Sequence, residues 1–171
     1  MKKYEFTGET KEIRLLFRTA TLHRIRATVA FGIVEVGDLG GWIEKEENLS
    51  HEGKAWVCGD AKVWGNAKVW GNAEVCGDAE VWGNAEVFSA SHVLVIGAIG
   101  SRNDFTTFYR DKDNEITVKC GRFLGKIDRF LEKVTQTHGD SKYALVYRAA
   151  VEVAKLQIDL SGEAPKDADE E

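Results

Sequence analysis

The middle of the chain alternates apolar and polar residues with a six-residue period. From residue 55 it runs AWVCGD, AKVWGN, AKVWGN, AEVCGD, AEVWGN, AEVFSA and SHVLVI, and residues 49–54 form a degenerate first unit. Alanine and valine stand two positions apart in each unit, so in an extended chain both point to one side and the charged residue between them points to the other. The Gly and Asn or Asp that follow tolerate positive φ, which predicts a corner. Each unit is therefore predicted to be a short strand followed by a turn.

Residues eighteen positions apart match better than residues six apart, which predicts three units in each turn of a coil. A helix is excluded because a Gly-Asn pair every six residues would destabilise it by over about 1 kcal/mol per turn. We therefore expect a mostly β fold with a short three-sided parallel β-helix over residues 49–96, preceded by an N-terminal β cap over residues 1–48. The offset of eighteen brings together Cys58 and Cys76, Trp64 and Trp82, Trp70 and Phe88, Lys62 and Glu80, and Lys68 and Glu86.

The repeat ends at residue 96, and a different pattern follows. The runs FTTFYR and ITVKCGRF, separated by the polar turn DKDNE, predict a β-hairpin. Apolar residues at helical spacing then predict one amphipathic helix over residues 126–137 and a second over residues 142–158. Residues 97–160 are thus predicted to form a ββαα domain, and the acidic residues 161–171 a disordered tail.

The composition and charge exclude several classes of protein. Of 171 residues, 43% are apolar and 30% charged, as in an ordinary soluble protein. The tail carries five acidic residues and one lysine, so the rest of the chain accounts for little of the net charge of -5 and general nucleic-acid binding is not expected. We see no signal peptide and no apolar run that would span a bilayer, which predicts a cytoplasmic protein without membrane contact.

The cysteines and other candidate ligands show no metal-binding spacing, and the sequence implies no metal and no cofactor. Cys58 and Cys76 are expected to be free thiols on the outside of a protein in a reducing compartment.

Large aromatic side chains recur at the outward positions of the repeat. If alanine and valine fill the interior, these side chains present on the order of 600 Å² of aromatic surface, more than a soluble monomer usually leaves open. Self-association as a dimer or trimer, cover by the C-terminal helices and cover by a foreign partner are all open explanations. The predicted interface residues are Trp64, Trp70, Trp82 and Phe88.

A glycine-opened turn after the repeat contains the most suggestive polar residues. Backbone N–H groups beside arginines and hydroxyls suit a phosphate or carboxylate. The alternative is a structural junction between the coil and the hairpin. The candidate ligand-binding residues are Ser101, Arg102, Asn103, Asp104, Thr107, Tyr109, Arg110 and Arg122.

Residues 22–27 (LHRIRA), 37–44 (GDLGGWIE), 48–51 (NLSH) and 55–57 (AWV) resemble the opening of YdcK-like hexapeptide-repeat proteins, which are common in phages and prophages. The resemblance covers roughly residues 20–96 and implies a left-handed β-helix related to the hexapeptide acyltransferases.

The function expected from these features is that of a non-catalytic oligomeric binding protein. Its phage context suggests action against a host defence system, by binding a defence protein or by sequestering an anionic, nucleotide-type signal. One alternative is a CoA-dependent acyltransferase with His92 as the catalytic base. The other is a purely structural assembly module.

Overall fold

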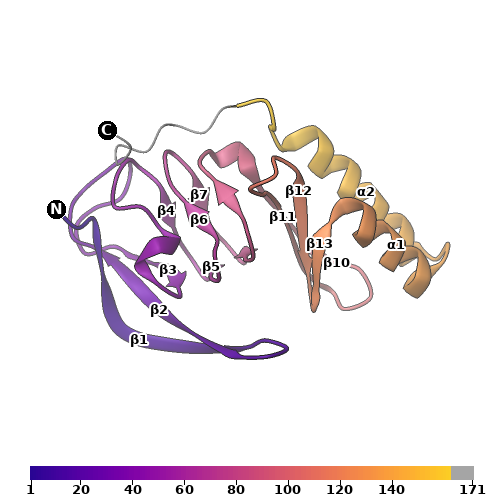
Figure 1. Ribbon diagram of the computed structural model, residues 1–171, viewed down its shortest axis with the longest axis horizontal. Coiled ribbons are helices and arrows are strands. Elements are labelled where there is room, and N and C mark those ends of the chain that lie inside the picture. Colours follow the sequence, from indigo (N-terminus) through magenta and orange to yellow (C-terminus); the bar gives the residue numbers. More distant parts are fainter. Residues whose placement is uncertain (163–171) are drawn as a thin grey trace.

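The computed structural model describes residues 1–162 and shows a mostly β fold with two C-terminal helices. A stack of very short strands, a four-stranded sheet and a pair of helices follow one another along the long axis of the molecule, and the N-terminal hairpin runs beside the stack (Figure 1). The predicted tail over residues 161–171 lies outside the described residues from position 163 onward.

The N-terminal segment forms a long hairpin attached to the side of the stack. Strands β1 (Tyr4–Arg14) and β2 (Thr19–Ala27) pair antiparallel, and β2 pairs antiparallel with β3 (Leu39–Ile43). β3 in turn pairs parallel with the second short strand of the repeat, so the hairpin continues one sheet of the stack. A 3-10 turn, η1 (Glu46–Asn48), leads from β3 into the repeat.

The repeat forms short parallel pairs in open sheets, and each pair joins residues eighteen positions apart. Trp56 pairs with Glu74, Lys62 with Glu80 and Lys68 with Glu86, which confirms the predicted register. The alanines and valines of residues 55–87 are 0–1% exposed and form one continuous core. The six strands are β4 (Trp56–Val57), β5 (Lys62–Val63), β6 (Lys68–Val69), β7 (Glu74–Val75), β8 (Glu80–Val81) and β9 (Glu86–Val87).

The two cysteines of the repeat are joined, so the prediction of two free thiols is wrong. Cys58 and Cys76 form a disulfide between neighbouring strands, with their Cα atoms 4.6 Å apart. The eighteen-residue register places the two side chains directly against each other, within the Cα separation that a disulfide needs. Within residues 1–162, Cys120 is the remaining free thiol.

The aromatic side chains of the repeat form two columns, Trp64 on Trp82 and Trp70 on Phe88, and other parts of the chain largely cover both. The prediction of an outward-facing aromatic interface therefore fails for Trp64 and Phe88. Trp64 stacks on Trp82 with the ring centroids 5.8 Å apart, and Trp64 is 1% exposed. The β1–β2 hairpin folds back along the stack and packs Ala20 and Leu22 against this column (Figure 1). The cover is therefore intramolecular, but it comes from the N-terminal hairpin and not from the C-terminal helices.

The second aromatic column, Trp70 and Phe88, is also covered by the chain at Phe88. Phe88 is buried, with its ring centroid 5.1 Å from that of Trp70, and the guanidinium of Arg110 lies over its ring. Trp70 and Trp82 are half-buried, so neither column leaves a wide aromatic face open to solvent.

The C-terminal part has four strands and two helices, two strands more than predicted. After the 3-10 turn η2 (Ala90–His92), the sheet runs in the order β10 (Val93–Ile99), β11 (Asp104–Arg110), β12 (Ile116–Cys120) and β13 (Phe123–Lys126), all antiparallel. The predicted last repeat, SHVLVI, contributes most of β10, because its alternating pattern fits an ordinary strand equally well.

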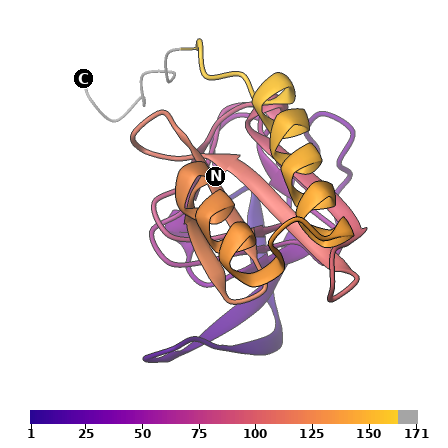
Figure 2. The same ribbon diagram turned by 90° about the vertical axis from the view of Figure 1, so that its right-hand side faces the viewer.

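The four-stranded sheet lies between the stack and the helices. One face contributes Val93, Val95, Tyr109 and Leu124 to the core of the stack. The other face packs Phe108 and Val118 against α1 (Ile127–His138) and α2 (Lys142–Gln157), whose bounds are close to those predicted. Both helices lie on the outer side of the sheet (Figure 2). None of the helices in residues 1–162 is long and apolar enough to cross a bilayer.

Candidate functional site

The structure divides the predicted ligand-binding residues into two groups at different places on β11. Thr107 and Tyr109 face the stack and are 1% and 0% exposed. The Thr107 Oγ1 atom accepts a hydrogen bond from the Glu80 backbone N–H at 3.0 Å, and the Tyr109 hydroxyl donates to the Trp82 carbonyl at 2.6 Å. These bonds satisfy backbone groups at the end of the stack, so both side chains are engaged in structure.

Arg110 is likewise engaged. Its Nη1 atom donates to the Glu86 carbonyl at 3.1 Å, its Nε atom donates to the Asn114 side chain at 2.9 Å, and the side chain is almost fully buried. These contacts agree with the alternative expected from the sequence, that this segment is a structural junction between the repeat and the hairpin.

His92 is also buried, at 2% exposed. Its Nδ1 atom accepts a hydrogen bond from the Phe88 backbone N–H at 3.3 Å. Burial lowers the pKa of the imidazole below its ordinary value, and the nearby Arg110 lowers it further, while Asp159 opposes the shift. A general base must reach the proton that it removes, and the structure gives His92 no such access.

The turn between β10 and β11 places the second group of predicted residues at the opposite end of the strand. Ser101, Arg102, Asn103 and Asp104 are exposed there. Asn103 adopts a positive φ of 49°, a conformation that asparagine tolerates, and its N–H donates to the Gly100 carbonyl at 3.2 Å. The turn is therefore well defined and holds its polar side chains at the surface.

This turn lies beside the turn between β12 and β13, and three cationic side chains come from the two turns and the end of β12. The Arg102 guanidinium lies so close to Gly121 that a methyl group on that glycine would overlap it. The Lys119 ammonium donates to the Gly121 carbonyl and lies 3.3 Å from a carboxylate oxygen of Glu80. Arg122 is the next residue along and is exposed. We call Ser101, Arg102, Lys119 and Arg122 the Arg102 corner.

Helix α2 packs against the Arg102 corner through Tyr147. A methyl group on Gly100 would overlap the hydroxyl of Tyr147, which is 5% exposed. Burial raises the pKa of this hydroxyl, and so does the Cys120 thiol, whereas Ser101 and Arg102 act in the opposite direction. Cys120 in turn accepts a hydrogen bond from the Thr106 hydroxyl at 3.4 Å. The turn is thus held in place by a buried polar group rather than by apolar packing alone.

Charge at the corner is only partly compensated. Within residues 1–162, Arg102 and Arg122 form no ion pair, and Lys119 shares Glu80 with Lys62. The exposed Asp104 is the acidic side chain on the same turn. Such a site favours an anion with several oxygen acceptors, because each guanidinium can donate two parallel hydrogen bonds.

No protein-family model matches this chain, and comparison with curated proteins gives no match either.

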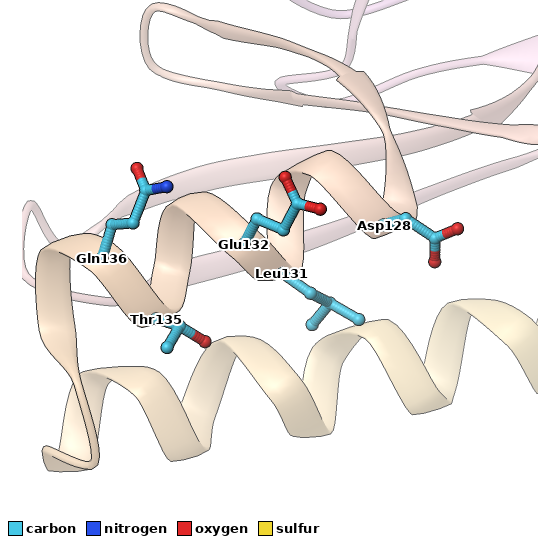
Figure 3. Close-up of a pocket in the computed structure, with 5 residues that line it drawn as sticks. All are labelled: Asp128, Leu131, Glu132, Thr135 and Gln136. Atoms are coloured by element: carbon cyan, nitrogen blue, oxygen red, sulfur yellow. The ribbon is translucent and has the colours of Figure 1, made fainter.

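Two depressions elsewhere on the surface are less suited to an anion. A shallow one of about 550 Å³ lies along α1, where Glu132 and Gln136 point away from α2 and Leu131 points toward it (Figure 3). A smaller one of about 180 Å³ lies between Trp82 and the β12–β13 strands. Asp111 in this second depression is already bonded to the Thr117 hydroxyl and to the Lys126 ammonium, each at 2.6 Å.

The sequence pointed to Arg102 and Arg122 but missed Lys119, Cys120 and Tyr147. Lys119 occupies an alternating position of a strand, which usually indicates a solvated face, and Tyr147 belongs to the apolar stripe of a helix. Their roles depend on which turns the sheet brings together, and no local pattern reports that.

Proposed function

We propose that this protein is a non-catalytic binding protein, built on a short three-sided β-helix, that binds an anionic, nucleotide-type ligand at the Arg102 corner. The eighteen-residue register, the small buried alanines and valines, and the glycine at the end of each unit support the coil. Its left-handedness follows from the resemblance to YdcK-like proteins. A coil of this kind is a rigid platform, and the C-terminal sheet fixes the corner to its end.

The observation that carries the proposal is that the Arg102 guanidinium and the Lys119 ammonium both lie against Gly121, with the exposed Arg122 next in the chain. Arg102 and Arg122 have no acidic partner in residues 1–162, whereas Lys119 is buried and is held by the Gly121 carbonyl and by the Glu80 carboxylate. A phosphate supplies several acceptor oxygens and a charge that is negative throughout the physiological range. The hydroxyl of Ser101, on the same turn, adds a neutral donor.

The biological role that fits such a protein in a phage is removal of a host defence signal or of a defence protein. Sequestration needs only tight binding, so a fold without an accessible base is sufficient. Acyl transfer by His92 is disfavoured because this side chain is 2% exposed and its Nδ1 atom is occupied by the Phe88 N–H. The alternative of a purely structural assembly module predicts that no ligand binds, so a binding experiment distinguishes it from the proposed function.

The test is native mass spectrometry of the purified protein, followed by thermal unfolding with inorganic phosphate and with a panel of mononucleotides and cyclic dinucleotides. We expect a bound adduct, or an increase in Tm with at least one nucleotide. Arg102→Ala and Arg122→Ala should each weaken binding by about 10- to 100-fold, the value of one or two charge-assisted hydrogen bonds. Arg129→Ala is the matched control, because Arg129 is an exposed arginine on α1.

Two results would overturn the proposal. If neither adduct nor Tm shift is found across the panel, the corner is not an anion site and the structural alternative stands. If a nucleotide binds with the same affinity to the Arg102→Ala variant as to the wild type, the ligand lies elsewhere on the molecule.

A further inference from the structure

Trp82 is the last ring of its aromatic column, and it borders a small depression. Trp64 and Trp82 stack with their rings 14° from parallel and the centroids 5.8 Å apart, so one face of Trp82 is covered. The eighteen-residue register places no further repeat unit on the other side, because residue 100 belongs to the turn between β10 and β11. The depression of about 180 Å³ between Trp82 and the β12–β13 strands lies at this end of the column.

The depression has the size and the walls for one flat ring. Pockets for drug-sized ligands measure roughly 300–1,000 Å³, so this smaller space holds a single ring system. Half-buried Trp82 supplies an aromatic wall and Leu124 an apolar one, while Gly83 and Gly125 add no side chain. Nucleobases are commonly bound by stacking on an aromatic side chain of this kind.

The polar groups of the depression favour a flat ring over a sugar, whose hydroxyl groups would each need a partner. The Asp111 carboxylate is buried and already accepts hydrogen bonds from the Thr117 hydroxyl, the Lys126 ammonium and two backbone N–H groups. Asp113 is also paired with Lys126, at 3.0 Å. The side chain of Asn84 is exposed and has no hydrogen bond within residues 1–162, so one amide remains to meet the edge of a base.

The depression and the Arg102 corner lie along one rim of the C-terminal sheet. Leu124, which lines the depression, pairs in register with Lys119, and both side chains face the stack. The Lys119 ammonium donates to the Gly121 carbonyl, and the Arg102 guanidinium lies against the same glycine. Leu124 is three residues from Gly121, so their Cα atoms are at most about 11 Å apart. A single nucleotide bridges that separation.

The two ends of this rim differ in charge. The exposed arginines of the Arg102 corner have no acidic partner within residues 1–162. The lining of the depression instead contains two carboxylates, those of Asp111 and Asp113, and one ammonium, that of Lys126. A phosphate is therefore favoured at the corner and disfavoured in the depression, where an uncharged ring is accepted. This polarity suits a ligand that has a neutral ring at one end and an anionic group at the other.

From these contacts we infer that the depression is a base subsite, in which the ring of a nucleotide stacks on Trp82 while its phosphate lies at the Arg102 corner. The inference rests on the proposed function, and it assigns a place to the part of the ligand that the corner does not hold. It requires that a nucleotide binds more tightly than the same sugar phosphate without a base.

The test compares the four ribonucleoside monophosphates with ribose 5-phosphate, which carries the same phosphate and no base. Isothermal titration calorimetry gives the affinities of the wild type, Trp82→Leu and Arg102→Ala. We expect the wild type to prefer at least one nucleotide by about 5- to 150-fold, the range that stacking of one base provides. Trp82→Leu should abolish this preference without changing the affinity for ribose 5-phosphate, whereas Arg102→Ala should weaken both ligands.

Two matched variants separate stacking from a general loss of structure. Trp82→Phe keeps an aromatic ring and should retain most of the preference. Trp70→Leu removes a half-buried indole from the same position of another repeat unit, away from the depression, and should bind like the wild type. Thermal unfolding of each variant checks that the chain remains folded. In the wild type, the preferred nucleotide should also quench tryptophan fluorescence, and ribose 5-phosphate should not.

Failure of the base subsite can be distinguished from failure of the proposed function. If neither the nucleotides nor ribose 5-phosphate bind, the proposed function is wrong and the subsite falls with it. If the nucleotides bind no more tightly than ribose 5-phosphate, or if Trp82→Leu keeps the full preference, only the subsite is refuted. Binding of glucose that Trp82→Leu abolishes would also overturn the inference, because the depression would then be a sugar site.

Discussion

Replacing Thr107 by valine tests whether β11 caps the last strands of the stack. The Thr107 hydroxyl is the acceptor for the Glu80 backbone N–H at 3.0 Å, and the side chain is 1% exposed. Valine has nearly the same shape as threonine, so the substitution removes the hydrogen bond without opening a cavity. The Glu80 N–H would be left at a buried junction without a partner.

The expected cost follows from that orphaned donor. A buried backbone N–H that loses its acceptor destabilises a protein by about 1–3 kcal/mol. For a chain of this size, each 1 kcal/mol lowers Tm by about 2–4 °C, so Tm should fall by roughly 2–12 °C. Valine is favoured over most residues in a strand, and that preference opposes the loss only by a few tenths of a kcal/mol.

The assay is equilibrium urea unfolding followed by circular dichroism and by tryptophan fluorescence. Thr21→Val is the control, because Thr21 is an exposed strand residue of β2, and its effect should lie within about 0.5 kcal/mol of zero. If Thr107→Val also stays within 0.5 kcal/mol, the Glu80 N–H is solvated and the capping role of β11 is refuted. A change in the slope of the unfolding curve would instead indicate that the two halves unfold separately.

Three other substitutions probe the remaining parts of the molecule. Leu22→Ala should destabilise the protein by about 2–5 kcal/mol and shift the tryptophan emission to longer wavelength in a urea titration, because Leu22 is fully buried over the Trp64 column. Gly100→Ala should lower Tm, measured by differential scanning calorimetry, because Gly100 has a φ of 76° and a methyl group there would overlap the Tyr147 hydroxyl. Burial keeps the pKa of His92 below 6.5 in the folded state, so the unfolded chain takes up a proton on this histidine first as the pH falls. The free energy of unfolding that this neutral histidine contributes above pH 6.5 is therefore lost as the pH drops through the folded-state pKa. His92→Gln should therefore flatten the loss of urea stability between pH 7 and pH 5, and an unchanged slope would contradict the burial of a neutral imidazole.

The register of the repeat could be predicted because all the information lies within one segment. Cys58 and Cys76, or Lys62 and Glu80, are related by a fixed offset along the chain, and the offset alone decides which strands meet. The cover on Trp64 could not be predicted in the same way. It depends on Leu22 and Ala20, which approach that column only because β3 extends the same sheet and carries the hairpin with it.

The last predicted unit of the repeat contributes to β10 of the C-terminal sheet, and the reason is local. The residues of β10 alternate like the repeat before them, so pattern alone assigned them to one more unit. The corner shows a similar limit. The sequence shows Arg102 as a cation on a turn, but its proximity to Gly121 follows from the pairing of β11 with β12, which a single strand pattern does not determine.

The eighteen-residue register also limits how this protein can change length. The hairpin is fixed to the β5–β8 column through β3, while β11 is fixed to the end of the stack at β8 and β9. In the proposed three-sided coil, inserting one hexapeptide would move every later unit to the next of the three strand pairs, and the Arg102 corner would then point away from its present direction relative to the hairpin. Only an insertion or deletion of three hexapeptides preserves the alignment of the two ends. Variation in repeat number that keeps this geometry must therefore occur in blocks of eighteen residues.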